Sequence, residues 1–138
     1  MKKILILHTG GTIAMKENLL TGGVSPDVIN PLLDAEITVP TNVDLVMEDI
    51  FNLPSPHIMP KHMLILKNRI LEAYDAGING IVITHGTDTL EETAFFLDTT
   101  IGDKLPIVLT GAMRSSNELG SDGLYNFESA IRVASCDE

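Results

Sequence analysis

The segment from Ile81 to Ala94 constrains the fold more than any other part of this 138-residue chain. It begins with a short apolar run that is typical of a strand buried on both faces, and Gly86 then indicates a turn. Two hydroxyl groups and one carboxylate follow within three residues, and a helical pattern begins after them. Reactive side chains placed where a strand passes into a helix lie at the working edge of an α/β sheet.

Apolar runs that end at glycine alternate with helical patterns along the rest of the chain. This alternation predicts a doubly wound, mostly parallel α/β sheet with helices on both faces, similar to a Rossmann fold, in one domain over residues 1–138. A mobile loop is expected over residues 15–24. Strands are expected over 4–7, 43–51, 80–84 and 106–110, and helices that begin at Ser25, at Pro60, at Asp88 or Thr89, and at Ser121 or Asp122.

Helical spacing predicts which side chains face the sheet. A capping box that joins Asp88 or Thr89 to Glu91 or Glu92 is expected at the start of one helix, and Gly77 is expected to end another. The lone Cys136 is interpreted as a small core residue. The side chains expected to face the sheet are Met63, Leu66, Ile70 and Tyr74 in one helix, Leu90, Ala94 and Leu97 in the next, and Leu124, Phe127, Ile131 and Val133 in the last.

Composition excludes several classes of partner. The formal net charge of −10 argues against nucleic acid and anionic membranes, because phosphate binding needs clustered Lys and Arg. No apolar run approaches the roughly 20 residues of a membrane span, and no signal peptide is recognisable, so the cytoplasm is the expected compartment. One cysteine allows no internal disulfide, and no Cys/His spacing resembles a zinc site.

The turn from Thr9 to Thr12 is the first candidate site. Its two glycines would let the backbone approach a ligand closely, and Thr12 would present a hydroxyl at the sheet edge. The alternative is a plain turn whose threonines bond nearby backbone. The run matches neither the dinucleotide fingerprint nor the P-loop.

The turn from His85 to Thr89 is the second candidate. Asp88 would lie at a helix N-terminus, where it could bind a substrate ammonium group or serve as an N-cap. His85 is as consistent with a buried structural group as with an acid or base. Ser55 and His57 lie on a proline-rich turn, which could hold a substrate or be only a turn. A salt bridge or a helix cap would explain Asp122 and Arg114.

Taken together, four motifs resemble the bacterial asparaginase/glutaminase family. They are Thr9–Ala14, His85–Ala94, Leu109–Ser115 and Ser121–Gly123, and they occur in the family's order over nearly the whole chain. The resemblance implies an L-asparagine amidohydrolase that releases aspartate and ammonia through a threonine acyl-enzyme, without cofactor or metal.

The resemblance also implies a role for particular residues. Thr12 resembles the nucleophile, and Thr87 and Asp88 resemble the second threonine and the aspartate of the active site. Asp88 would hold the substrate's α-amino group, and Ser55 its α-carboxylate. The amides around Gly86 and Thr87 would contribute to the oxyanion site.

Two departures from the family pattern bear on activity. Residues 15–24 contain no Tyr, which the family often places there, and the family's catalytic Lys lies beyond the last motif. A threonine hydroxyl needs a neighbouring base, and no lysine of this chain follows a strand beside these motifs. Family members also carry a smaller C-terminal domain and assemble as dimers or tetramers. An N-terminal fragment that is inactive alone is therefore expected.

Two alternatives remain open. One is an amidase of tRNA-dependent amidation, which would need further domains and a basic surface. The other is a non-catalytic α/β module that binds small amino acids. Replacement of Thr12 separates an enzyme from a binding module.

Overall fold

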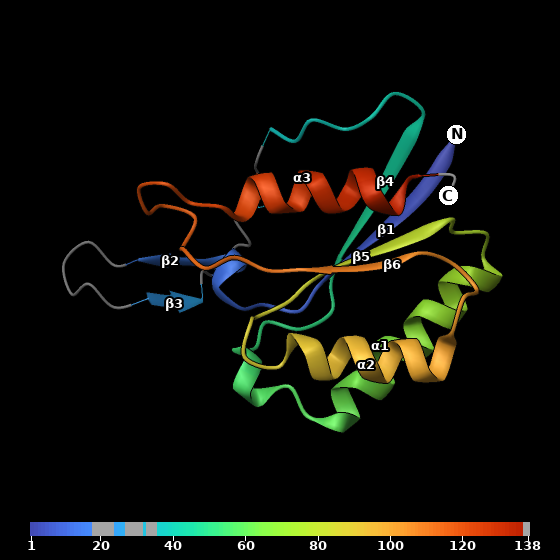
Figure 1. The fold of residues 1–138 in the computed structure, drawn as a ribbon, viewed down its shortest axis with the longest axis horizontal. Coiled ribbons are helices and arrows are strands. Elements are labelled where there is room, and N and C mark those ends of the chain that lie inside the picture. Colours follow the sequence, from blue (N-terminus) through green and yellow to red (C-terminus); the bar gives the residue numbers. More distant parts are fainter. Residues whose placement is uncertain (18–23, 27–31, 33–35, 137–138) are drawn as a thin grey trace.

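The computed structural model describes residues 1–17, 24–26, 32 and 36–136. Its centre is a four-stranded sheet in the order β4-β1-β5-β6, in which every neighbouring pair is parallel (Figure 1). The predicted parallel α/β architecture is confirmed. The chain builds outward from β1 in both directions, so the switch point of the sheet lies between β1 and β5. The strands are β1 (Lys2–His8), β4 (Val43–Asp49), β5 (Gly80–Thr84) and β6 (Ile107–Thr110).

Helices cover both faces of this sheet, as predicted. Helices α1 (Pro60–Asp75) and α2 (Leu90–Ile101) lie on one face, and α3 (Gly123–Ala134) lies on the other (Figure 1). The side chains of β1 alternate between two apolar cores, with Ile4 and Ile6 on the α3 side and Leu5 and Leu7 on the opposite side. Burial on both faces explains why the run from Ile4 to Leu7 is continuously apolar.

The prediction of a mobile loop over residues 15–24 was wrong at both ends. Strands β2 (Met15–Glu17) and β3 (Val24–Pro26) pair antiparallel in a small second sheet. Pro26 therefore lies in a strand and does not begin a helix, and the rest of the helix expected after Ser25 falls outside the described residues. Three-residue strands are too short to show the alternating pattern that identifies a strand in sequence.

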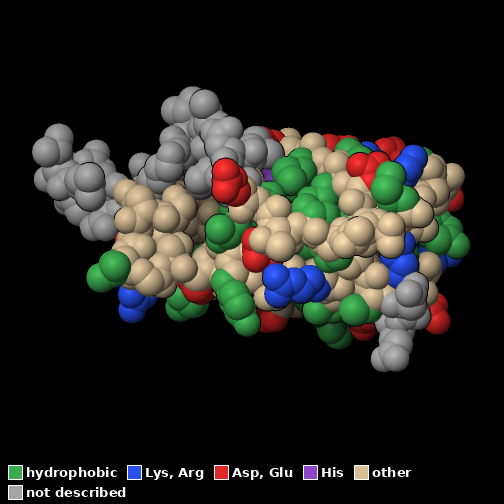
Figure 2. All heavy atoms as spheres, turned by 90° about the horizontal axis from the view of Figure 1, so that it is seen from above, with side chains coloured by type: hydrophobic (Ala, Val, Ile, Leu, Met, Phe, Trp, Pro, Cys, Tyr) green, Lys and Arg blue, Asp and Glu red, His purple; other side chains and the backbone are tan. Residues whose placement is uncertain are grey.

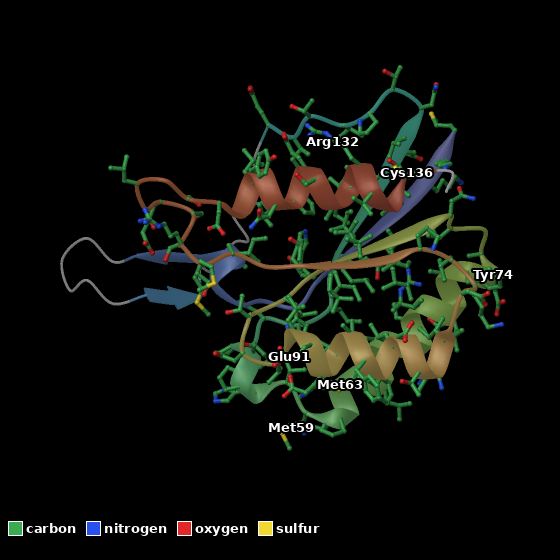
Figure 3. All side chains as sticks on the ribbon, viewed as in Figure 1. Met59, Met63, Tyr74, Glu91, Arg132 and Cys136 are labelled. Carbon is green, nitrogen blue, oxygen red and sulfur yellow. The ribbon has the colours of Figure 1, made fainter. Side chains whose placement is uncertain are left out.

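The starts of α1, α2 and α3 agree with the sequence analysis, but some predicted core positions were wrong. Gly77 follows α1 with a φ of 85°, a left-handed conformation that suits glycine. Met63, Leu66, Ile70 and Leu97 are buried as expected, whereas Leu90 and Ala94 are only half-buried. Tyr74 is 42% exposed at the end of α1, and the buried position is that of Ala73 (Figure 3).

Some of the core positions predicted in α3 were also wrong. Phe127 and Ile131 are buried, but Leu124 and Val133 are exposed. Figure 2, which views the molecule from above, shows hydrophobic side chains at the surface among charged ones. Cys136 is also exposed, just beyond α3, where its thiol donates to the Arg132 carbonyl at 3.2 Å (Figure 3). The interpretation of this cysteine as a core residue was wrong. In the described part of the chain, no helix is long and apolar enough to cross a membrane.

Candidate active site

Three turns at the carboxyl edge of the sheet meet through direct backbone contact. A Cβ atom on Gly11, in the turn after β1, would lie 2.5 Å from the amide nitrogen of Gly86, in the turn after β5. A Cβ atom on Gly86 would in turn lie 2.5 Å from the Cβ of Ser55, which begins the short 3-10 helix η2 (Ser55–His57) after β4. Real Cβ atoms do not approach so closely, so only glycine lets these segments pack together.

The contact between Gly11 and Gly86 brings the two predicted motifs to one place. Thr12 is the residue after Gly11, and it is half-buried at the start of the 3-10 helix η1 (Thr12–Ala14). Thr87 is the residue after Gly86, and it is exposed. The predicted convergence of the two strand ends, at the switch point between β1 and β5, is therefore present in the backbone.

Ser55 and Asp88 form a reciprocal hydrogen-bonded pair. The Ser55 hydroxyl donates to Asp88 Oδ2 at 3.0 Å and accepts the Asp88 backbone N–H, also at 3.0 Å. Ser55 is 3% exposed, whereas Asp88 is exposed. The structure thus joins two of the residues that sequence analysis placed in one site, and it leaves the Asp88 carboxylate open to the edge of the sheet. His57 is exposed at the end of η2.

The expected capping box at the start of α2 is not formed. Thr89 occupies the N-cap position, but its side chain makes no capping hydrogen bond. Its hydroxyl donates instead to the Ser55 carbonyl at 2.9 Å. This contact was not predictable from the sequence, because the pattern of Thr followed by Glu is the same whether the hydroxyl binds its own helix or another turn.

His85 is a buried structural group that shapes the second turn. Its Nδ1 lies 2.7 Å from the Gly86 carbonyl, and its Nε2 lies 2.9 Å from the Thr93 hydroxyl. Because a carbonyl can only accept, Nδ1 carries the proton and Nε2 accepts from Thr93. Burial lowers the pKa of His85, which favours the neutral ring. Both ring nitrogens are occupied, so the structural interpretation of His85 is favoured over acid–base catalysis.

His8 and Thr9 fix the end of β1 to β5, a role that sequence analysis did not assign to them. The Thr9 hydroxyl donates to the Thr84 carbonyl at 2.8 Å, and His8 Nδ1 lies 2.8 Å from the Thr84 hydroxyl. His8 is 1% exposed, and burial lowers its pKa to about 4 despite the opposing charge of Asp49. Its Nε2 has no hydrogen-bond partner among the described residues.

The turn after β6 is held by Asp122. This residue is the N-cap of α3, and its carboxylate accepts the backbone N–H groups of Met113 and Arg114, both at 3.1 Å. These hydrogen bonds, led by that of Met113, lower the pKa of Asp122. The Arg114 guanidinium donates to the Leu119 carbonyl at 2.7 Å. Asp122 therefore acts as a turn anchor at one wall of a cavity of about 270 Å³, which Thr87 also lines.

No cluster of three or more His, Cys, Asp or Glu residues that could hold a metal ion occurs in the described ranges. The polar groups gathered at the carboxyl edge include hydroxyls, backbone amides and the exposed Asp88 carboxylate. These groups suit the binding of a small polar molecule and nucleophilic chemistry on it.

The fold and the site define a doubly wound α/β domain with hydroxyl and carboxylate groups at its switch point. Comparison with known proteins agrees with this class. The chain belongs to the asparaginase family, since the family model for the N-terminal part of asparaginase matches residues 3–138. The family resemblance read from the motifs is confirmed.

Relatives and solved structures support the same assignment. The chain is 41% identical over 138 residues to an L-asparaginase of Bacillus licheniformis, covering 96% of this chain and 42% of that protein. It is 39% identical to one of the subunits of a glutamyl-tRNA(Gln) amidotransferase of Methanococcus vannielii, covering 97% of this chain and 32% of that protein.

Its fold is similar to a thermostable L-asparaginase from Thermococcus kodakarensis, with a TM-score of 0.79, 34% identity, and coverage of 96% of this chain and 40% of that chain. A probable cytoplasmic L-asparaginase from Campylobacter jejuni gives a TM-score of 0.78 at 36% identity, with coverage of 99% and 41%. The chain thus spans about two fifths of the length of these L-asparaginases.

Proposed function

We propose that this chain supplies the nucleophile and the substrate-binding groups of an L-asparagine amidohydrolase. The Thr12 hydroxyl would attack the side-chain amide carbon, ammonia would leave, and water would hydrolyse the resulting ester to give aspartate. The observation that carries this proposal is the contact of Gly11 with Gly86, beside the hydrogen-bonded pair of Ser55 and Asp88. Asp88 would bind the substrate's α-ammonium group, and Ser55 would bind its α-carboxylate.

The peptide between Gly86 and Thr87 supports an oxyanion role. The Gly86 carbonyl points toward the buried His85 ring, with which it is hydrogen-bonded. In a trans peptide the carbonyl and the N–H point in opposite directions, so the Thr87 N–H points away from that ring. A backbone N–H fixed in this way can stabilise the negative charge that develops on the attacked amide oxygen.

Thr12 also needs a proton acceptor. Neither His85 nor His8 suits that role, because both ring nitrogens of His85 are hydrogen-bonded and His8 is buried. We infer that the base is the lysine that the family resemblance places beyond the last motif, acting with Thr87 and Asp88, and that residues 1–138 alone hydrolyse asparagine poorly or not at all. A cytoplasmic location and assembly as dimers or tetramers belong to the same proposal.

The test is Thr12→Ala in the full-length protein. We expect ammonia release from asparagine to fall by a factor of about 10³ or more, because removal of a nucleophile eliminates the covalent route. Binding of aspartate, measured by calorimetry, should persist, since Ser55 and Asp88 remain. Thr99→Ala, at an exposed threonine near the far end of α2, is the matched control and should keep full activity. Unchanged turnover in Thr12→Ala would contradict the role of Thr12 as nucleophile, whereas aspartate binding without turnover in the wild type would favour a non-catalytic binding module.

The similarity to a component of a glutamyl-tRNA(Gln) amidotransferase favours a second candidate, an amidase of tRNA-dependent amidation. The formal net charge of −10 argues against direct contact of this chain with tRNA. Purified protein that releases ammonia from asparagine without RNA or a partner protein supports the first candidate. Turnover that appears only with glutamyl-tRNA, ATP and a partner protein supports the second.

A further inference from the structure

The Thr89 hydroxyl does not cap α2, although Thr89 occupies the N-cap position. Thr89 is the N-cap of α2, where a threonine side chain would ordinarily accept a backbone N–H of the first helical turn. Here the hydroxyl donates to the Ser55 carbonyl, 34 positions away in sequence, at 2.9 Å. Loss of an N-cap hydrogen bond lowers the stability of a helix. The contact with Ser55 is therefore formed in place of a favourable local one.

The Ser55 carbonyl accepts two hydrogen bonds. It accepts the Ile58 N–H at 3.0 Å, which closes η2, and it accepts the Thr89 hydroxyl. Pro54 and Pro56 flank Ser55 and restrict the backbone of this turn. A turn stiffened in this way moves as a unit, so a contact at the Ser55 carbonyl determines where the Ser55 hydroxyl lies.

The consecutive residues Asp88 and Thr89 hold Ser55 at its two ends. Asp88 contacts the Ser55 hydroxyl through both its backbone N–H and its carboxylate, and Thr89 contacts the Ser55 carbonyl. Ser55 comes from the loop after β4 and Asp88 from the turn after β5, two strands that are not neighbours in the sheet. Side-chain hydrogen bonds between these loops, together with the close packing of Gly86 against Ser55, thus relate the two substrate-binding groups to each other.

We propose that Thr89 is a positioning residue that sets the distance and angle between Ser55 and Asp88, and thereby matches them to the α-carboxylate and α-ammonium groups of one amino acid. This inference rests on the proposed function. Thr89 acts through the Ser55 turn and does not contact the substrate itself. Its effect therefore falls on recognition of the α-carbon end of the substrate, whereas the scissile amide lies at the other end.

The test compares hydroxyl removal at Thr89 with removal of a similar hydroxyl elsewhere in α2. Thr89→Val removes the donor and keeps the branched shape, and Thr89→Ser keeps the donor. Thr99→Val is the matched control, because the Thr99 hydroxyl also donates to a carbonyl, that of Phe95 at 2.7 Å, but far from Ser55. All variants are made in the full-length protein, and thermal unfolding is measured for each.

We expect Thr89→Val to raise the KM for asparagine about tenfold and to change kcat less than about threefold, since a tenfold change corresponds to about 1.4 kcal/mol, within the range of one hydrogen bond. The inhibition constant of L-aspartate should rise about tenfold as well. That of β-alanine, which lacks the α-carboxylate, should change less than about threefold. Thr89→Ser should restore the wild-type KM, and Thr99→Val should leave it unchanged.

Each other outcome has a defined meaning. Wild-type protein without asparagine turnover contradicts the proposed function. Active wild-type protein with an unchanged KM in Thr89→Val overturns the role of Thr89. So does a fall in kcat at constant KM, equal losses for L-aspartate and β-alanine, or a KM in Thr89→Ser as high as in Thr89→Val. If Thr89→Val does not fold, Thr89→Ala removes the hydroxyl without a β-branched side chain and carries the same expected results.

Discussion

The turns after β1 and β5 lie against each other, but close packing and side-chain hydrogen bonds contribute to them in different proportions. The turn after β1 contains Gly10 and Gly11 at φ values of 106° and 83°, and neither has room for a side chain. The turn after β5 is held by side-chain hydrogen bonds, from His85 to Gly86 within the turn and from Thr89 to Ser55 outside it. Both glycines of the first turn are closely packed, whereas the second turn adds several side-chain hydrogen bonds to the close packing of Gly86 against Ser55.

The two turns of the candidate site are expected to have different tasks. A turn held by close packing has one allowed position, which suits the proposed nucleophile Thr12. A turn held by several hydrogen bonds can be altered one contact at a time, which suits the proposed substrate-binding group Asp88. Substitutions in the first turn should therefore have large, all-or-none effects, and substitutions in the second should have graded effects.

The largest loss in the free energy of unfolding is expected for Gly11→Ala, and Gly77→Ala is its matched control. Both glycines have nearly the same φ, 83° and 85°, but an added Cβ at Gly77 meets nothing within 4 Å. Gly77→Ala should cost only the left-handed strain of about 1–2 kcal/mol. Gly11→Ala should cost more than about 4 kcal/mol, because its Cβ overlaps the backbone of Gly86. Urea unfolding measures both, and equal losses would show that close packing does not position the first turn.

The comparison also shows what the sequence could predict. Continuous apolar runs identified the buried strands, and the glycines after them indicated turns, because both signals depend on local chain geometry. Parallel strands place their carboxyl ends at one edge, so the meeting of the motifs of Thr12 and Asp88 followed from topology. Packing of the first turn against the second was thus predictable in outline.

The side-chain partners that hold the second turn were not predictable in the same way. Thr89 has a good capping sequence, yet its hydroxyl binds Ser55, which only the folded loop brings near. Tyr74 fits the helical period but falls at the exposed end of α1, and Cys136 lies beyond the end of α3. Periodicity gives the direction of a side chain around a helix, but not whether a neighbouring element covers it.

A pH-dependent change of about 2 kcal/mol in the free energy of unfolding is expected from His8, at the end of β1. Burial lowers the pKa of His8 to about 4 from 6.5, so the unfolded chain binds a proton more readily than the folded one between these pH values. The contribution of His8 to stability is therefore full above about pH 6.5 and decreases as the pH falls toward 4. Between pH 7 and pH 5 it should fall by about 2 kcal/mol.

The free energy of unfolding at pH 7 and pH 5 tests this prediction, with His8→Leu beside the wild type. The variant should lose about 2 kcal/mol less than the wild type over this interval. His57→Leu, at an exposed histidine, is the matched control and should lose as much as the wild type. If His8→Leu keeps the full acid sensitivity, the proton is taken up elsewhere, and the end of β1 tolerates a charged His8.

The smallest loss in the free energy of unfolding, about 1 kcal/mol, is expected for Thr93→Val, which removes a hydrogen bond that supports the second turn. Thr93 is fully buried, and its hydroxyl donates to His85 Nε2, so valine leaves that nitrogen without a partner while keeping the side-chain shape. Thr93→Ser retains the donor and should recover most of the loss. Thr100→Val removes an exposed hydroxyl that binds the Phe96 carbonyl and should change stability by less than about 0.5 kcal/mol.

A double-mutant cycle with His85→Leu and Thr93→Val tests whether these two residues act together. Thr93 acts on the turn only through the ring of His85, which in turn binds the Gly86 carbonyl. Once the ring is absent, the second substitution should therefore cost almost nothing. Additive losses would mean that the Thr93 hydroxyl and the Gly86 carbonyl are stabilised independently. The second turn would then be held as the first one is, by the packing of its backbone, and the contrast between the two turns would disappear.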